Sequence, residues 1–289
     1  MSKSIDYLIL GSFGMLGHIV LRYLEEQGFN VIGVSRRPES SQNITLDVRD
    51  FFALERLISE LKPSYIVNCV GLLNEDAESS FSDALTINSL LPRFLENVTK
   101  NMQTKIIHVS TDCVFSGSRG SYEVSDFPDA IDIYGKTKYL GEINNTKDIT
   151  IRTSIIGPDI NIKGKGLYQW FMNQEGSIKG YDRVIWSGVT TIQLAKFIAY
   201  LFDHQHSGLI HYSNNIPISK FDLLHLLKSC FNKNLTINNF SEVVYDKSLI
   251  SNSVFDDHSV PSYKKMISDM RHWIELHPEL YSHYFAGQI

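Results

Sequence analysis

The sequence predicts an α/β protein with a Rossmann-type, doubly wound parallel sheet and a smaller C-terminal cap. Short apolar runs alternate with helical patterns of about a dozen residues through the first half of the chain. The first of these runs ends in a glycine-rich turn that opens a helix. After about residue 154 the alternation weakens. We therefore expect a Rossmann core over residues 1–157 and a mixed region over residues 158–289 that completes the sheet and forms the cap.

The predicted strands are runs of aliphatic and aromatic residues that end at glycine or at a polar residue. The first, DYLIL at 6–10, is followed at once by Gly11. Runs that are apolar throughout are typical of strands buried on both faces, as in a parallel sheet. By the same pattern we expect the other strands at 29–34, 65–70, 105–110, 149–152 and 209–212.

The helices between these strands are predicted from apolar residues that return every three or four positions. In the first helix, Leu16, Val20 and Leu24 share one face. The helix at 51–61 stops before Pro63, because proline cannot continue a helix. The full set is expected at 15–27, 51–61, 82–100, 133–143 and 191–202, with helical stretches at 223–230 and 263–276.

Composition excludes several classes of protein. The 289 residues carry a net charge of −5, so the chain is a poor candidate for binding nucleic acid or an anionic membrane surface. Three cysteines cannot form a disulfide framework, which favours a reducing compartment, and we expect the cytoplasm. No apolar run reaches the roughly 18 residues of a transmembrane helix. The spacing of the histidines matches no zinc motif, so no metal is expected.

The turn after the first strand predicts a dinucleotide site. It reads G-x-x-G-x-x-G and lies between a strand and a helix. Glycines permit a tight turn and close approach of a pyrophosphate, and the helix N-terminus offers free N–H groups and the positive end of its dipole. The expected contacts are Gly11, Phe13, Gly14, Met15, Leu16 and Gly17.

The residues after the second strand favour NADPH over NADH. An NAD enzyme usually carries an acidic residue here for the ribose 2′-hydroxyl, whereas this chain has Ser35, Arg36 and Arg37. Two guanidinium groups would attract a 2′-phosphate. Asp47 and Val48 follow the next short strand, where the carboxylate can accept a hydrogen bond from the adenine amine.

Two further segments are expected beside the cofactor. Cys69, Val70 and Gly71 end the strand at 65–70, where small residues let the backbone approach the ribose. Asn88, in the helix at 82–100, is expected to order the active-site helix through backbone contacts. We count all four among the cofactor-site residues.

Three side chains form a candidate catalytic group. Tyr134 and Lys138 make a Y-x-x-x-K pair that shares one helix face, so Lys138 can lie beneath the phenol and reach the nicotinamide ribose. An unperturbed tyrosine has a pKa of about 10, and a neighbouring ammonium group should lower it. Tyr134 then becomes a general acid for a carbonyl that receives hydride. Thr111, at the end of the strand at 105–110, can donate to the same carbonyl oxygen.

Four segments in order carry a family resemblance: GSFGMLG, STDCVFSG, YGKTKYLGE and IRTSIIG, between Ile5 and Gly157. They resemble the extended short-chain dehydrogenase/reductases, and among these the dTDP-4-dehydrorhamnose reductases. The resemblance implies a catalytic triad at Thr111, Tyr134 and Lys138, with NADPH as cofactor. It also implies reduction of the C4 ketone of a nucleotide-linked 4-keto-6-deoxy sugar, in the synthesis of deoxysugars for surface polysaccharides.

The same resemblance implies a substrate site. The segment Ile151-Arg152-Thr153-Ser154 matches the family loop beside the nicotinamide and the sugar. Apart from the resemblance, Trp170 and Trp186 could stack on a sugar or base, with packing in the core as the alternative. The expected substrate residues are Thr111, Asp112, Cys113, Arg152, Thr153, Ser154 and Trp170. The chain departs from the family where Cys113 replaces a tyrosine, and where the C-terminal Arg-Pro pattern is reduced to Asp246-Lys247-Ser248-Leu249.

Two alternatives stay open at this stage. GDP-fucose synthase, another extended member, has a cysteine two residues after the triad hydroxyl, so Cys113 could serve an epimerase or an epimerase-reductase. That chemistry needs a thiolate base and a partnering acid, often histidine, yet no histidine lies between His108 and His204. We therefore favour Cys113 as a small packing residue. A non-catalytic NADP-binding subunit is the other alternative, which the intact triad disfavours. The sequence leaves the sugar, the nucleotide and a homodimer open.

Overall fold

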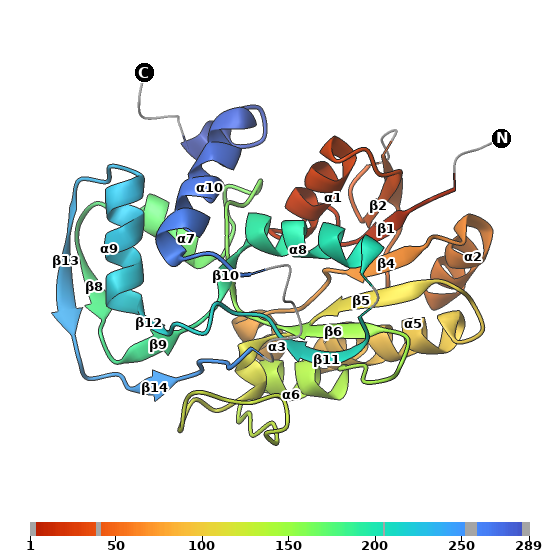
Figure 1. Ribbon diagram of the computed structural model, residues 1–289, viewed down its shortest axis with the longest axis horizontal. Coiled ribbons are helices and arrows are strands. Elements are labelled where there is room, and N and C mark those ends of the chain that lie inside the picture. The colour runs from red at the N-terminus through yellow and green to blue at the C-terminus, as the bar shows by residue number, and fades with distance from the viewer. Residues whose placement is uncertain (1–3, 39–41, 205, 252–258, 285–289) are drawn as a thin grey trace.

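The computed structural model describes residues 4–38, 42–204, 206–251 and 259–284. Its centre is a seven-stranded parallel sheet in the order β11-β6-β5-β4-β1-β2-β3 (Figure 1). The strands are β1 (Tyr7–Leu10), β2 (Val31–Ser35), β3 (Asn43–Thr45), β4 (Tyr65–Asn68), β5 (Lys105–Val109), β6 (Ile149–Arg152) and β11 (Gly208–His211). The order reverses direction after β1, as in a doubly wound Rossmann sheet, so the predicted fold class is confirmed.

Helices cover both faces of this sheet. On one face lie α1 (Gly17–Glu26), α8 (Thr191–Asp203) and α10 (Tyr263–Leu276), and on the other α2 (Phe51–Leu61) and α5 (Leu91–Thr99). Strand β1 joins the two cores. Its Tyr7 and Ile9 pack with the first group of helices, whereas Leu8 and Leu10 pack with the second, because successive side chains of a strand point to opposite faces. All four side chains are fully buried.

The helix predicted at 82–100 is interrupted. It consists of α4 (Phe81–Ala84), the π-helical η1 (Leu85–Leu90) and α5. A π-helical turn inside a helix commonly marks a functional site. Asn88 lies in this turn and is fully buried. Its hydrogen bonds reach residues distant in sequence, so no local pattern in 82–100 could have predicted the interruption.

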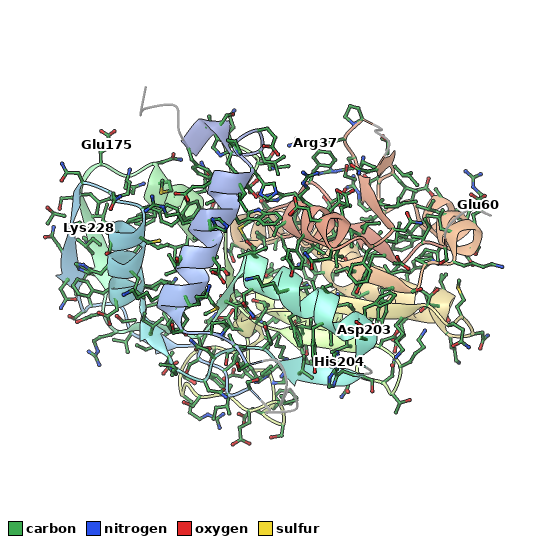
Figure 2. The ribbon with its side chains drawn as sticks, turned by 45° about the horizontal axis from the view of Figure 1, so that its top comes forward. Arg37, Glu60, Glu175, Asp203, His204 and Lys228 are labelled. Atoms are coloured by element: carbon green, nitrogen blue, oxygen red, sulfur yellow. The ribbon has the colours of Figure 1, made fainter. Side chains whose placement is uncertain are left out.

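Among the described residues, three small sheets and two helices lie at one end of the central sheet and form the cap (Figure 1). The sheets pair β7 (Ile155–Ile156) with β10 (Val189–Thr190), β9 (Val184–Trp186) with β12 (Ile218–Ser219) and β14 (Tyr245–Asp246), and β8 (Gly176–Tyr181) with β13 (Leu235–Phe240). The helices are α7 (Leu167–Met172) and α9 (Lys220–Cys230). Lys228 on α9 and Glu60 on α2 mark opposite ends of the molecule (Figure 2).

Elements that follow the first cap strands also belong to the central layers, α10 among them. Strand β11 pairs with β6 at the edge of the sheet, and α8 packs against α1. Within the described ranges, no helix is both long and apolar enough to cross a membrane.

Candidate active site

The glycine-rich turn is shaped by steric limits at two of its residues. Gly11 has φ +83°, in the left-handed region that favours glycine. A Cβ at Gly17 would lie only 2.1 Å from the carbonyl oxygen of Gly11, so any side chain would push α1 off the end of β1. Ser12 is buried inside the turn and donates to Asn43 Oδ1 at 2.7 Å. At its glycines the turn therefore presents bare backbone to the carboxyl edge of the sheet.

A cavity of about 690 Å³ opens over this turn. Predicted cofactor residues line it from four separate segments: Gly11, Phe13, Gly14, Ser35, Arg36, Arg37, Asp47, Val48, Cys69, Val70 and Gly71. Gly17 serves the turn by packing against Gly11. The lining residues follow the ends of β1, β2 and β4, which meet at one edge of the sheet. Sheets of this kind bind ligands at that edge.

One wall of this cavity is cationic. The Arg37 guanidinium lies over the Phe13 ring, 5.1 Å from its centroid, and donates to Asn161 Oδ1. Arg36 lines the same wall. The acidic residue nearby is already paired: Arg49 Nη2 lies 2.6 Å from Asp47 Oδ2, and hydrogen bonds from Arg49 hold the pKa of that carboxyl below its ordinary value.

A second cavity of about 700 Å³ continues from the first. The two share Gly14 and the segment 69–71. The second cavity is lined by the predicted residues Met15, Leu16, Thr111, Asp112, Cys113, Tyr134, Lys138, Thr153 and Ser154. The structure thus places the predicted triad and the glycine-rich turn along one continuous space.

Local capping positions the tyrosine and the lysine. Helix α6 (Ile133–Leu140) begins where Asp132 Oδ1 accepts from Gly135 N at 2.6 Å. Tyr134 and Lys138 follow one turn apart and are both buried, and Lys138 Nζ donates to the carbonyl oxygen of Val109 at 2.7 Å. That bond ties α6 to the end of β5.

The hydroxyl of the triad is held in a short 3-10 turn, η2 (Asp112–Val114). Thr111 Oγ1 accepts from Cys113 N at 3.1 Å and donates to Asp112 Oδ1 at 3.1 Å. A Cβ at Gly135 would lie 2.1 Å from the carbonyl oxygen of Cys113. Glycine at this position therefore lets α6 press against the turn that carries the threonine.

The predicted effect of Lys138 on the tyrosine is wrong for this structure. We expected the ammonium group to lower the pKa of Tyr134, but burial raises it well above its ordinary value. Burial also lowers the pKa of Lys138 to about 8, opposed by the carboxylate of Glu142. The phenol is consequently neutral near pH 7, which is the form that can give away a proton.

Asn88 is a positioning residue behind the cavity wall and not a lining residue. Its Oδ1 accepts from Leu72 N at 2.9 Å, while its Nδ2 donates to the Leu72 carbonyl and to Thr137 Oγ1, each at 3.0 Å. The side chain thus joins the loop after β4 to α6. This matches the ordering role expected for it, but corrects its place among the cofactor contacts.

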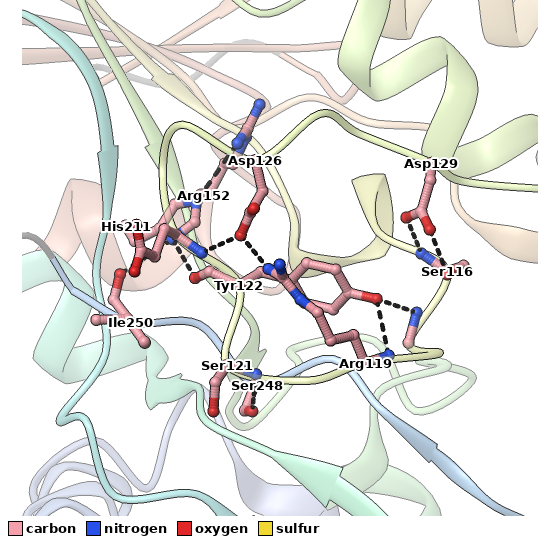
Figure 3. A network of polar contacts seen from close by, with 12 residues as sticks. Ser116, Arg119, Ser121, Tyr122, Asp126, Asp129, Arg152, His211, Ser248 and Ile250 are labelled. Carbon is pink, nitrogen blue, oxygen red and sulfur yellow. Dashed lines mark hydrogen bonds and ion pairs between the residues drawn. The ribbon is translucent and has the colours of Figure 1, made fainter.

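Arg152 is also corrected. Its guanidinium is 2 % exposed and forms a two-pronged ion pair with Glu142, at 2.7 Å from each carboxylate oxygen. Figure 3 shows it beside His211, at the inner end of a polar network that reaches Tyr122 and Asp126. Arg152 supports the sheet edge and is not placed to bind substrate.

Trp170 lines neither cavity. It lies on α7 with 40 % of its surface exposed. Trp186 lines a smaller adjoining cavity together with Lys220, Tyr245 and Lys247. Sequence reasoning missed Lys220 and Tyr245, since nothing local separates them from ordinary residues of the cap.

Asn161 was missed for the same reason. It lies 124 residues from Arg37, whose guanidinium donates to its side chain. Within the described part of the chain, no group of three or more His, Cys, Asp or Glu side chains could hold a metal ion.

Comparison with known proteins identifies the family. Residues 5–234 match the family described as RmlD substrate binding domain. The chain belongs to this family. Among curated proteins of similar sequence, methionine adenosyltransferase 2 subunit beta of Xenopus tropicalis is 25% identical over 239 residues, which cover 78% of this chain and 72% of that one. The dTDP-4-keto-6-deoxy-D-glucose reductase of Streptomyces niveus is 27% identical over 230 residues, 76% of each chain.

Solved structures agree with the RmlD assignment. A hypothetical dTDP-4-dehydrorhamnose reductase from Sulfolobus tokodaii superimposes with a TM-score of 0.78 at 28% identity, over 90% of this chain and 98% of that one. The dTDP-4-dehydrorhamnose reductase of Bacillus anthracis, solved in complex with NADP, gives 0.80 at 22% identity, over 93% and 99%. At 22% identity, the Bacillus anthracis structure shows that the two chains share a fold.

Proposed function

We propose that this protein is an NADPH-dependent reductase of the C4 ketone of a nucleotide-activated 4-keto-6-deoxy sugar. The observation that carries the proposal is the continuity of the two cavities. One holds Arg36 and Arg37, and the other holds Thr111, Tyr134 and Lys138. Membership of the RmlD family and the name of the Streptomyces niveus relative support the same reaction.

The residues present fit NADPH. Bound across both cavities, NADPH would supply the hydride that reduces the ketone carbon. The turn at 11–17 would hold the pyrophosphate beside the N-terminus of α1, where the helix dipole favours an anion and glycine lets a phosphate approach the backbone. Arg36 and Arg37 would hold the 2′-phosphate, and the paired Asp47 adds no free carboxylate to repel it.

The triad then handles the oxygen of the ketone. Thr111 Oγ1 would turn its single proton from Asp112 Oδ1 to the ketone oxygen and so position the carbonyl. As hydride adds to the carbon, the carbonyl electron pair moves to oxygen, and Tyr134 Oη transfers its proton there to give the alcohol. The positive charge of Lys138, fixed by Val109, stabilises the phenolate that remains. A neutral phenol is the required starting form, which burial of Tyr134 favours.

Burial argues against Cys113 as an epimerising base. It raises the pKa of this thiol to about 12, assisted by the neighbouring carboxylate of Asp112. A thiolate near neutral pH would need a cationic partner that outweighs both effects. We therefore propose simple reduction, in a cytoplasmic enzyme of deoxysugar synthesis whose mixed region at 158–289 completes the sheet and supplies the cap that binds the nucleotide sugar.

The test is turnover with a panel of nucleotide-linked 4-keto-6-deoxy sugars, followed by the loss of NADPH absorbance. Tyr134→Phe should lower kcat by about 10² or more while NADPH binding is unchanged, because only proton transfer is lost. Tyr139→Phe, on the same helix but outside the cavity, is the matched control. Full activity in Tyr134→Phe would refute the mechanism. Deuterium uptake from water beside the ketone would indicate epimerisation instead.

A further inference from the structure

A smaller cavity of about 170 Å³ leads from the catalytic space into the cap. It shares Asp112, Cys113 and Ser154 with the catalytic cavity. Its other walls come from β9, α9 and β14, which lie far apart in sequence. A substrate whose ketone lies at the triad would extend into this space, because it is directly continuous with the residues that flank Thr111.

Two lysines from separate elements meet in this cavity. Lys220 begins α9, and Lys247 follows β14 directly. Their ammonium groups lie 6.0 Å and 5.9 Å from the ring centroid of Tyr245. Two cationic side chains in the lining of one cavity favour an anionic ligand there.

No protein anion within the described residues forms an ion pair with either ammonium group. The lysine ion pairs found there are those of Lys147, Lys165, Lys196 and Lys265. Among the described residues, Asp112 is the carboxylate that lines the cavity, and it attracts both lysines, but its single negative charge faces two positive ones. The cavity therefore keeps an excess of positive charge beside the catalytic turn.

The backbone fixes Lys247 in place. Asp246 N donates to the Gly117 carbonyl at 2.7 Å, and Tyr122 N donates to the Ser248 carbonyl at 2.8 Å, so both neighbours of the lysine are anchored to the loop that follows the triad threonine. A further hydrogen bond, from Ser121 N to Ser248 Oγ at 2.8 Å, is drawn in Figure 3. A Cβ at Gly117 would lie 2.9 Å from Lys247 Cγ, so glycine leaves room for the lysine stem.

We propose that Lys220 and Lys247 form the subsite for the phosphate on the anomeric carbon of the sugar. This inference rests on the proposed function. In a six-membered ring C1 lies opposite C4, so a ketone at the triad directs the anomeric phosphate away from it, toward the far wall that carries the lysines. A uronic acid carries its carboxylate on C5, next to the C4 ketone, so its negative charge would lie near the triad and not near the lysines.

The test measures binding of unreactive nucleotide sugars to protein saturated with NADP⁺. Calorimetric titration with dTDP-, UDP- and GDP-glucose identifies the tightest ligand. Lys220→Met and Lys247→Met should each raise its Kd about 10-fold or more, as expected for loss of a charge-assisted bond. Lys228→Met, on α9 but outside the cavity, should leave the Kd unchanged.

Competition experiments distinguish a sugar phosphate from a sugar carboxylate as the anion that the subsite binds. Glucose 1-phosphate should displace the nucleotide sugar from the wild-type protein, and glucuronate and methyl glucoside should not. Equal Kd values in the wild type and both lysine variants would overturn the subsite, as would absence of binding by all three nucleotide sugars or displacement by glucuronate. Tyr134→Phe should bind like the wild type. Failure of the proposed reaction would therefore be seen separately, in turnover.

Discussion

Cofactor preference offers a direct test of the arginine wall. Both guanidinium groups are exposed, so their attraction to a 2′-phosphate is partly screened. Two unit charges 4 Å apart attract by about 1 kcal/mol in water and about 4 kcal/mol at a typical protein surface. We take about 1–2 kcal/mol for each exposed arginine. Since 1.4 kcal/mol is a factor of ten, Arg36→Ala and Arg37→Ala should each raise the KM for NADPH about 5- to 30-fold.

The structure also ranks the two arginines. Arg37 is already held by Phe13 and Asn161, so it loses less conformational freedom when a phosphate binds. Its replacement should therefore have the larger effect. The KM for NADH, which lacks the phosphate, should stay within about 2-fold in both variants, since the screened attraction applies to the phosphate alone.

The assay compares initial rates with NADPH and NADH for each variant at low and high salt. Arg56→Ala is the control for loss of a surface charge, because Arg56 lies on α2 with only an exposed partner, Glu60, at 3.7 Å. The NADPH effect should shrink as salt screens the attraction. Equal increases of KM for both cofactors, or no increase, would refute this assignment of the cationic wall.

Two other predictions concern buried charges. Lys138 has a folded-state pKa of about 8, below its ordinary 10.5, so kcat/KM should fall as the pH rises through about 8 and the ammonium group loses its proton. The free energy of unfolding should rise between pH 8 and 10.5, because over that range the unfolded chain binds the proton and the folded chain does not. A kcat/KM that stays constant across that range would contradict the assigned role of Lys138. Arg152→Met should lower the free energy of unfolding, measured with urea, by about 3–5 kcal/mol because Glu142 is left buried and unpaired. Arg22→Met is the control, because Arg22 pairs with Glu26 at the surface and its replacement should lower the free energy of unfolding by at most about 1 kcal/mol. Equal decreases in the two variants would contradict the role assigned to the buried Arg152–Glu142 pair.

Long, strongly patterned elements could be predicted from the sequence. The bounds of α2, β6 and α10 agree with the predicted ranges, since each has a clear periodicity or a defined stop. The short strands of the cap were not predicted. Strands of two or three residues, such as β7 and β14, are too short to show a period, and their existence depends on partners distant in the chain.

The residues of the site also fall into two groups, those that contiguous motifs predict and those whose role depends on partners distant in the chain. The glycine-rich turn, the arginines and the triad come from contiguous motifs, and the structure brings them to one edge of the sheet. Arg152 was misassigned because its partner, Glu142, is recognisable only once β6 and α6 are packed together. The pKa of Tyr134 was misjudged because proximity in sequence shows the cation but not the loss of solvent around the phenol.

The way the chain passes between sheet and cap limits how new substrate specificities can be built. After β6 the chain enters the cap, returns to the central layers for α8 and β11, and leaves again for α9, β13 and β14. A chimaera joined at a single point after residue 157 would exchange β11 and α8 together with the cap. Transplanting a foreign sugar preference therefore requires two separate grafts, within 155–190 and 212–250, while the recipient keeps its own edge strand.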